Sequence, residues 1–238
     1  LNNPEKFLWE DLLSVPRAKE PHFAYGSAVH AALLEWGRQM KSGTLLTLDT
    51  LIETFSTALS THEVITDKDR KHWLHIGTQS LPRYYRERLA SPHLIGGLEK
   101  RLSARMGEVR LKGFLDRFDL YHESGRNVHV IDYKTGTPKT DKQVKEEYNG
   151  STFRQLVFYK LLTDLSSDFG GYEATEFSFD FIGEGEHEPR RITFEITQNE
   201  VTALKELIRE VWDKIHALDF IATVPVASES MTAPAKTQ

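Results

Sequence analysis

The chain has 238 residues, of which 39% are hydrophobic and 11% aromatic, so it is long and apolar enough to bury a large core as one domain. It contains no cysteine, which excludes disulfide bonds and cysteine-bound zinc or iron–sulfur clusters. Its formal net charge of −5 at pH 7 is not typical of a protein that binds nucleic acid over its whole surface.

The first third of the chain is predicted to be helical. Gly26 and Ser27 resemble a helix start, and the alanine and leucine content that follows predicts a helix over 27–41. Two further helices are predicted over 48–60 and 67–90, the second with Pro82 in its interior.

Three histidines in these helices are candidate metal ligands. A lone histidine such as His30 is usually a packed or surface residue, so it does not indicate a metal site by itself. His72 and His75 have the i, i+3 spacing of a zinc pair, but no third ligand is obvious. Ordinary helix packing is therefore expected for this pair.

The remainder of the chain is predicted to be mostly β-structure with two more helices. A helix begins near Gly150, and a long amphipathic helix runs from Asn199 to about residue 218. Strands are predicted at 100–105, 109–121, 128–133, 176–182 and 191–196. This order indicates an α/β fold, with a central mixed β-sheet flanked by helices.

Two alternating segments, 111–121 and 127–134, are predicted to form an antiparallel hairpin with its turn near Ser124. In that register three pairs share one face of the sheet: Leu120 with Val128, Phe118 with Val130, and Asp116 with Asp132. Lys134 follows Asp132 by two residues and therefore lies on the same face.

The facing carboxylates of Asp116 and Asp132 repel each other, and burial increases the cost. A divalent cation held by oxygen ligands would compensate this repulsion. The alternative is an ion-pair cluster, in which Lys134 and Arg117 neutralise the two aspartates together with Asp119.

Four motifs together resemble the PD-(D/E)XK nuclease superfamily, specifically its RecB-like exonuclease branch. They are the segment that ends in His30, Gly-Phe-Leu-Asp116, Asp132-Tyr-Lys134 and Gln155-x-x-x-Tyr159, in the order of that family. The resemblance implies a restriction-endonuclease-like core. It covers roughly residues 1–220, which we expect to be one nuclease domain followed by a flexible tail over 221–238.

The resemblance also implies roles for individual residues. Asp116, Asp132 and His30 would bind Mg²⁺ or Mn²⁺, and both metals accept oxygen ligands and can tolerate an imidazole. Lys134 would assist the attacking water, and the other catalytic residues would be Gln155 and Tyr159. The predicted DNA contacts are Arg154, Gln155 and Tyr159.

Several of these residues also have structural interpretations. Tyr159 could pack in the core and Arg154 could be a solvated charge. Glu99 could be an outer acid of the metal site or a surface ion-pair partner of Lys100 or Arg101. Asp119 is predicted on the face opposite Asp116, in a structural pair with Arg117, His129 or Arg126. Two basic clusters could form local tracks or be solvated faces: Arg83, Arg86 and Arg88, and Arg101, Arg105, Arg110 and Lys112.

The implied function is a metal-dependent DNA nuclease, with exonuclease activity, that acts in DNA repair or recombination. The chain starts at Leu1 without a methionine and has no ATP-binding phosphate loop. We therefore expect a helicase motor elsewhere in the same polypeptide or complex. Two alternatives are a catalytically silent module that binds or routes single-stranded DNA for a helicase, and a module that only docks the motor. No membrane-length apolar run or signal peptide is visible, which favours a cytoplasmic protein without a membrane partner.

Overall fold

The structure is a computed structural model that describes residues 7, 20–44, 47–61, 65–89, 94–121, 125–146 and 150–218. The chain divides into two compact units, one made of residues 19–204 and the other of residues 1–18 with 205–238. The first unit contains the β-sheet and all the predicted site residues. The predicted flexible tail, 221–238, lies outside the described residues.

Three helices precede the sheet: α2 (Pro21–Lys41), α3 (Leu48–Ser60) and α4 (Asp67–Leu89). The last two match the predicted bounds closely. Helix α2 begins six residues earlier than predicted because a proline occupies its first turn, where its missing N–H costs no hydrogen bond. The interface between these helices is built from large side chains such as Trp36, Phe55 and Tyr84, which are almost completely buried.

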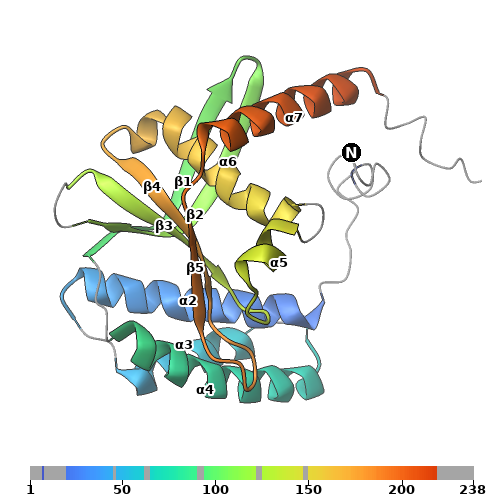
Figure 1. The fold of residues 1–238 in the computed structure, drawn as a ribbon. Coiled ribbons are helices and arrows are strands. Elements are labelled where there is room, and N and C mark those ends of the chain that lie inside the picture. Colours follow the sequence, from blue (N-terminus) through green and yellow to red (C-terminus); the bar gives the residue numbers. More distant parts are fainter. Residues whose placement is uncertain are drawn as a thin grey trace, which may run out of the picture. The chain divides into compact units, whose positions relative to one another are not determined.

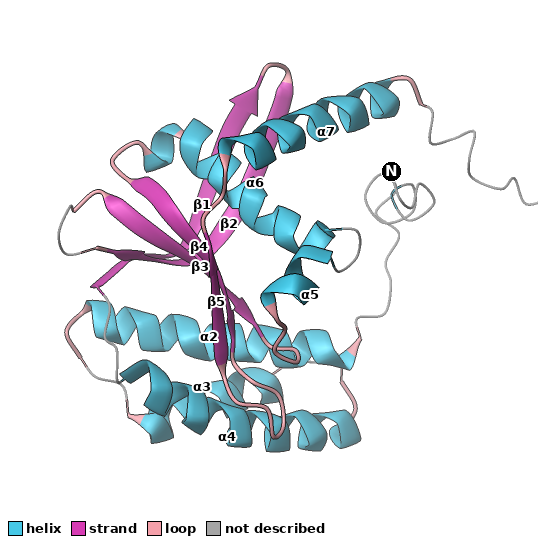
Figure 2. Cartoon of the chain, in the orientation of Figure 1, coloured by secondary structure: helices cyan, strands magenta, loops and turns pink. Residues whose placement is uncertain are grey.

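Five strands form one mixed sheet, coloured magenta in Figure 2, in the order in which they occur along the chain. They are β1 (Leu94–Met106), β2 (Val109–Leu120), β3 (Asn127–Lys134), β4 (Glu173–Phe181) and β5 (Arg190–Phe194). Only the β3–β4 pair is parallel. All five predicted strands are present, and β1 starts six residues before its predicted start.

The parallel pair requires a crossover, and this connection contains α5 (Asp141–Glu146), α6 (Ser151–Leu165) and the 3₁₀ turn η3 (Ser167–Phe169). Figure 1 shows α6 on the face of the sheet opposite α2, α3 and α4. Helix α7 (Gln198–His216) follows β5 and runs across the boundary between the two units. The short helix α5 was not predicted.

The predicted register of β2 and β3 is confirmed: Phe118 is opposite Val130, and Leu120 is opposite Val128. One more step of two residues places Asp116 opposite Asp132. Strand β3 is buried on both faces along most of its length, as is usual for a strand in the middle of an α/β sheet.

The two faces of β3 meet different helices. Ile131 and Tyr133 belong to the core formed with α2, α3 and α4, so Asp132, which lies between them, points to the opposite face, toward α6. The Asp132 carboxylate is therefore buried between the sheet and α6, so the groups that donate hydrogen bonds to it or neutralise its charge are important.

Gly113 allows the β1–β2 hairpin to lie close against α6. A Cβ atom at this position would be 2.5 Å from Cδ1 of Leu162, which is closer than side chains normally approach. A larger residue would therefore push the hairpin away from the helix.

A second buried carboxylate, Asp180 on β4, ties the sheet to α4. It accepts hydrogen bonds from Tyr84 Oη at 2.7 Å, from Arg191 Nη2 at 2.6 Å, and from Arg88. Burial alone would raise the pKa of Asp180, but the charges of Arg191 and Arg88 outweigh it and lower the pKa.

Among the described helices, none is both long and apolar enough to cross a membrane.

Replacing Asp180 with alanine is expected to destabilise the fold strongly, by about 3 kcal/mol, because the partly buried guanidinium groups of Arg88 and Arg191 would lose their buried counter-charge. The measurement is the free energy of unfolding from urea titration. Asp164→Asn is the control, since Asp164 forms only a half-exposed i, i+4 pair with Lys160 and its loss should cost less than about 1 kcal/mol. Equal effects of the two substitutions would contradict a structural role for the Asp180 cluster.

Candidate active site

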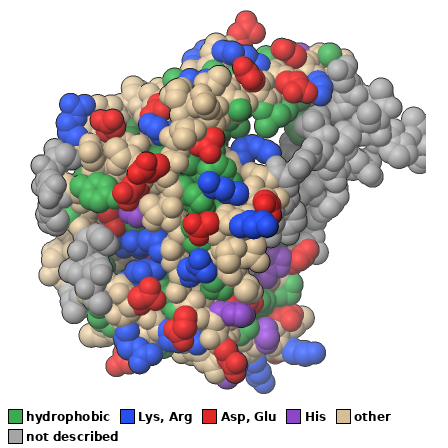
Figure 3. Space-filling model, in the orientation of Figure 1, with side chains coloured by type: hydrophobic (Ala, Val, Ile, Leu, Met, Phe, Trp, Pro, Cys, Tyr) green, Lys and Arg blue, Asp and Glu red, His purple; other side chains and the backbone are tan. Residues whose placement is uncertain are grey.

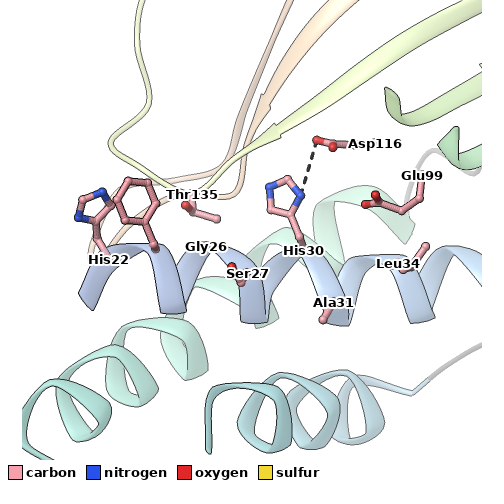
Figure 4. Close-up of a pocket in the computed structure, with 10 residues that line it drawn as sticks. His22, Gly26, Ser27, His30, Ala31, Leu34, Glu99, Asp116 and Thr135 are labelled. Carbon is pink, nitrogen blue, oxygen red and sulfur yellow. Dashed lines mark ion pairs between the residues drawn. The ribbon is translucent and has the colours of Figure 1, made fainter. Parts of the chain in front are cut away.

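Three potential metal ligands converge where α2 passes the β1–β2 hairpin. His30 projects from α2, Glu99 from β1 and Asp116 from β2, and their ligand atoms all lie within 4.8 Å of one another. Figure 4 shows these side chains pointing toward each other, with His30 Nδ1 at 3.7 Å from Asp116 Oδ2. Within the described ranges, no other group of three such side chains is as close.

The backbone at Glu99 contributes to this convergence. Its neighbours in β1 pair with Arg117 and Leu115, so Glu99 is opposite Asp116. Its φ of 45° lies in the left-handed region, which residues other than glycine seldom adopt. Such strain is often found at functional sites.

A pocket of about 630 Å³ opens beside these three residues. Residues from the first turns of α2 line one side of it, among them His22, Phe23 and Ser27, and Thr135 from the end of β3 lies nearby. Solvent therefore reaches the carboxylates, and there is space for a substrate group beside them.

Asp116 is the electrostatically strained member of the group. Burial raises the pKa of its carboxyl group to about 6, and the neighbouring charge of Asp132 contributes in the same direction. His30 and the backbone N–H of Tyr133, which donates to Oδ2 at 2.8 Å, oppose this shift without cancelling it. A cation at this place would remove the penalty of ionising Asp116.

Asp132 is held by α6 and by Lys134. Its Oδ1 accepts hydrogen bonds from Gln155 Nε2 at 2.8 Å and from Tyr159 Oη at 2.7 Å. Lys134 Nζ is 2.7 Å from Asp132 Oδ2 and donates a hydrogen bond to Gln155 Oε1 at 2.8 Å. These four side chains form one closed network.

The spacing of Gln155 and Tyr159 explains how both reach Asp132. At i, i+4 they share one face of α6, and Gln155 Nε2 also donates to Tyr159 Oη at 2.7 Å. The Tyr159 hydroxyl is buried beside the charge of Asp132, and both effects raise its pKa well above the usual range for tyrosine. Tyr159 therefore stays neutral and acts as a donor to Asp132.

The donor set fits a hard divalent cation. Glu99 and Asp116 offer carboxylate oxygens and His30 an imidazole nitrogen, which suits Mg²⁺ or Mn²⁺ better than a soft metal. Asp132 Oδ2 is buried, and its partner in this structure is the Lys134 ammonium at 2.7 Å. A carboxylate oxygen has more than one lone pair, so this atom can also face a metal ion.

The structure brings most of the predicted site residues together in two adjoining groups. Asp116 and His30 belong to the first, while Asp132, Lys134, Gln155 and Tyr159 form the second. The three side chains whose ligand atoms cluster most closely are His30, Glu99 and Asp116. Glu99 therefore belongs to this cluster, and Asp132 does not. Arg154 is partly buried on α6, and its contact with DNA stays a prediction.

Glu99 was predicted only as one of two alternatives, and the geometry favours the metal site. No ion pair joins it to Lys100 or Arg101 among the described residues, and its oxygens face His30 and Asp116. Asp119 forms the expected structural pair, with Arg117 Nε at 2.6 Å and Nη2 at 2.9 Å, both buried. The predicted strand began at residue 100, so the sequence did not place Glu99 opposite Asp116.

Comparisons with known proteins bear on the family and the fold of the chain. A family model described as "PD-(D/E)XK nuclease superfamily" matches residues 1–227. A crystal structure of a protein from Eubacterium rectale, described as a "putative exonuclease", is similar with a TM-score of 0.50 and 14% identity over 98% of this chain and 84% of that one. This likeness shows a shared fold. No curated protein sequence matches the chain.

The raised pKa of Asp116 predicts a stability effect in the metal-free protein. A carboxyl group that is harder to ionise when folded lowers the free energy of unfolding as the pH rises from about 4 to about 6, and the loss persists above pH 6. Asp116→Asn should therefore stabilise the protein in chelator at pH 7.5, by on the order of 2 kcal/mol.

The measurement is urea unfolding of both proteins in chelator at pH 4 and pH 7.5. The difference between them should shrink at pH 4, where the wild-type carboxyl group is protonated in the folded state and about half protonated in the unfolded chain. A difference that is independent of pH would contradict the assignment. Added Mn²⁺ should reverse the order at pH 7.5, because only the wild type keeps the full ligand set.

Proposed function

The chain belongs to the PD-(D/E)XK nuclease superfamily, and from this premise we propose that it is a metal-dependent deoxyribonuclease that hydrolyses phosphodiester bonds. The observation that carries the proposal is the network in which Lys134 contacts both Asp132 and Gln155, next to Asp116. A carboxylate pair with an adjacent ammonium group suits hydrolysis of an anionic substrate.

Asp116 and Asp132 would hold Mg²⁺ or Mn²⁺ together with His30, and Glu99 is placed to contribute directly or through water. When bound, the cation supplies positive charge that stabilises the additional negative charge of phosphodiester hydrolysis. The ligands come from α2, β1, β2 and β3, so the folded protein holds them in place before any metal or substrate arrives.

Lys134 would orient the attacking water and exchange a proton with it. Its ammonium group is held between Asp132 Oδ2 and Gln155 Oε1, which restricts it to one direction. Lysine suits this role because its proton affinity responds to its surroundings, whereas arginine stays protonated.

Gln155 and Tyr159 are positioning residues in this scheme. Together they donate two hydrogen bonds to Asp132 Oδ1, which leaves Oδ2 directed toward the cation and toward Lys134. Fixing the carboxylate in advance reduces the reorganisation needed when the substrate binds. With Arg154 at the same end of α6, they are also the proposed DNA contacts on this side of the site.

The finer assignment follows from the RecB-like motifs, Gln155-x-x-x-Tyr159 and His30. They support an exonuclease that works in DNA repair or recombination, together with a helicase motor in the same polypeptide or complex. A cytoplasmic location is part of this proposal.

The proposal predicts cleavage of linear DNA by this chain with Mg²⁺ or Mn²⁺ and none with chelator. Lys134→Ala and Asp132→Asn should each lower the cleavage rate by at least about 100-fold, because each removes a group that acts on the water or the cation. Lys134→Ala should keep most of its DNA affinity, measured by fluorescence anisotropy in chelator.

Lys160→Gln is the matched control, since Lys160 is a lysine on the neighbouring helix α6 that pairs only with Asp164. It should cleave at the wild-type rate. DNA binding without cleavage under every metal condition would contradict the enzyme assignment and favour a catalytically silent module that routes single-stranded DNA.

A further inference from the structure

One face of the β1–β2 hairpin is exposed and strongly basic. Three cross-strand pairs form it: Arg101 with Phe114, Ser103 with Lys112, and Arg105 with Arg110. All six side chains are exposed, while the alternate residues Leu102, Leu111 and Leu115 are buried beneath them. We call this face the hairpin strip.

The charges of the hairpin strip are unusual because they lack ion-pair partners among the residues that the structure describes. Arg105 and Arg110 are directly opposite each other, an arrangement of like charges that destabilises a sheet. None of the four cations forms an ion pair within the described part of the chain. Acidic residues outnumber Lys and Arg in the whole chain, so the lack of acidic partners at the hairpin strip does not follow from the composition.

The other basic cluster in the sequence, Arg83, Arg86 and Arg88, differs from the hairpin strip because most of its charges are paired. Arg88 forms an ion pair with the buried Asp180, and Arg83 pairs with Glu188 at 3.7 Å and with the Gly185 carbonyl. Two of its three arginines are therefore structural. On the molecular face shown in Figure 3, Lys, Arg, Asp and Glu are likewise interspersed and form no single large basic field.

The hairpin strip leads directly to the candidate metal site. Phe114 precedes Asp116 by two residues and Arg101 follows Glu99 by two, so along both strands the strip starts next to the carboxylates. At roughly 3.4 Å per residue, the distance along β2 from Asp116 to Arg110 is about 20 Å. Figure 1 shows this hairpin reaching beyond the ends of the other strands.

The far end of the strip is concave. Arg105, Arg110 and Lys112 line a pocket of about 430 Å³ together with Ser103, Ala104, Leu165 and Ser167. Three cations and two hydroxyl groups around one hollow match the chemistry of a phosphate. The near end instead carries an aromatic ring, Phe114, which is 49% exposed and has the Arg101 guanidinium 5.0 Å from its centroid.

We propose that the hairpin strip is the track along which one DNA strand reaches the active site. Its cations would contact successive phosphates, and a base would stack at Phe114 and Arg101. At the axial rise of one strand in duplex DNA, about 3.4 Å per nucleotide, this length spans at most about six phosphates, and an extended strand would place fewer along it. This inference rests on the proposed nuclease function and names the surface that presents the substrate.

A single strand fits these features better than a duplex. Stacking on Phe114 requires an unpaired base, because paired bases have their faces covered by their neighbours. A track one hairpin wide can also follow only one backbone at a time.

The test is the affinity of the full chain for a fluorescent 12-nucleotide oligothymidylate in chelator, measured by anisotropy at several salt concentrations. Arg105→Gln with Arg110→Gln should weaken binding at least about tenfold at 0.1 M salt and reduce the slope of log K against log salt by about 1.4. Arg105→Lys with Arg110→Lys should bind almost as the wild type does, because phosphate contacts depend on charge.

The matched control removes the same two charges elsewhere, with Lys71→Gln and Arg86→Gln, both exposed on α4. It should bind almost as tightly as the wild type. Phe114→Leu should lower the affinity severalfold without changing the salt slope, since stacking releases no counterions. Thermal melting of each variant checks that the hairpin still folds.

Equal binding by the two double glutamine variants would overturn the proposal, as would a wild type that does not bind the oligonucleotide. Tighter binding to duplex DNA that ignores Phe114 would overturn the single-strand assignment. Because binding is measured in chelator, the result is independent of catalysis. Strip-dependent binding without cleavage would support the track and reject the nuclease. Cleavage of DNA together with unaltered binding by the Arg105→Gln, Arg110→Gln variant would support the nuclease and reject the track.

Discussion

The candidate active site depends on two carboxylates held on facing strands at the centre of the protein. The pairing of β2 with β3 runs to Arg117 and Ile131, and extending that register by one residue places Asp116 opposite Asp132. The apolar pairs farther along the same strands fix the register. A shift of one residue would turn both the apolar side chains and the acids to the wrong faces. The fold therefore imposes the repulsion between these carboxylates.

The two carboxylates are compensated unequally, and this asymmetry gives the site its chemistry. Asp132 has Lys134 beside it and two hydrogen-bond donors from α6, whereas Asp116 has one backbone N–H and a histidine at 3.7 Å. Burial, with the charge of Asp132 acting in the same direction, raises the pKa of Asp116 to about 6. The side of the site left without a positive charge is also where His30 and Glu99 converge, which is the arrangement expected of a cation site.

The parts of this arrangement that follow a local period were predictable from the sequence. Alternation fixed the Phe118–Val130 pair and hence the facing acids, and the i, i+4 spacing placed Gln155 and Tyr159 on one face. The position of Glu99 beside His30 and Asp116 was not predictable in this way, since it depends on a positive φ that no sequence pattern reveals. The Asp180 cluster joins α4, β4 and β5 across about a hundred residues, and only the tertiary fold brings those side chains together.

The net charge of the chain also concealed a local property. A value of −5 argues against a generally basic surface, yet the alternation of β1 and β2 gathers four cations on one exposed face beside the carboxylates. Acids concentrated at the metal site and cations along the hairpin strip are both consistent with an anionic polymer as substrate. Charge distribution is thus more informative here than total charge.

The most direct test of the central claim is the position of Mn²⁺ in crystals of the full chain, located by its anomalous scattering. The account predicts a peak between β2, β3 and α2, within about 2.0–2.6 Å of oxygens of Asp116 and Asp132 and of a nitrogen of His30. Peaks confined to other places, such as His72 and His75 on α4, would contradict it, as would the absence of any peak at saturating Mn²⁺ with Lys134 still paired to Asp132.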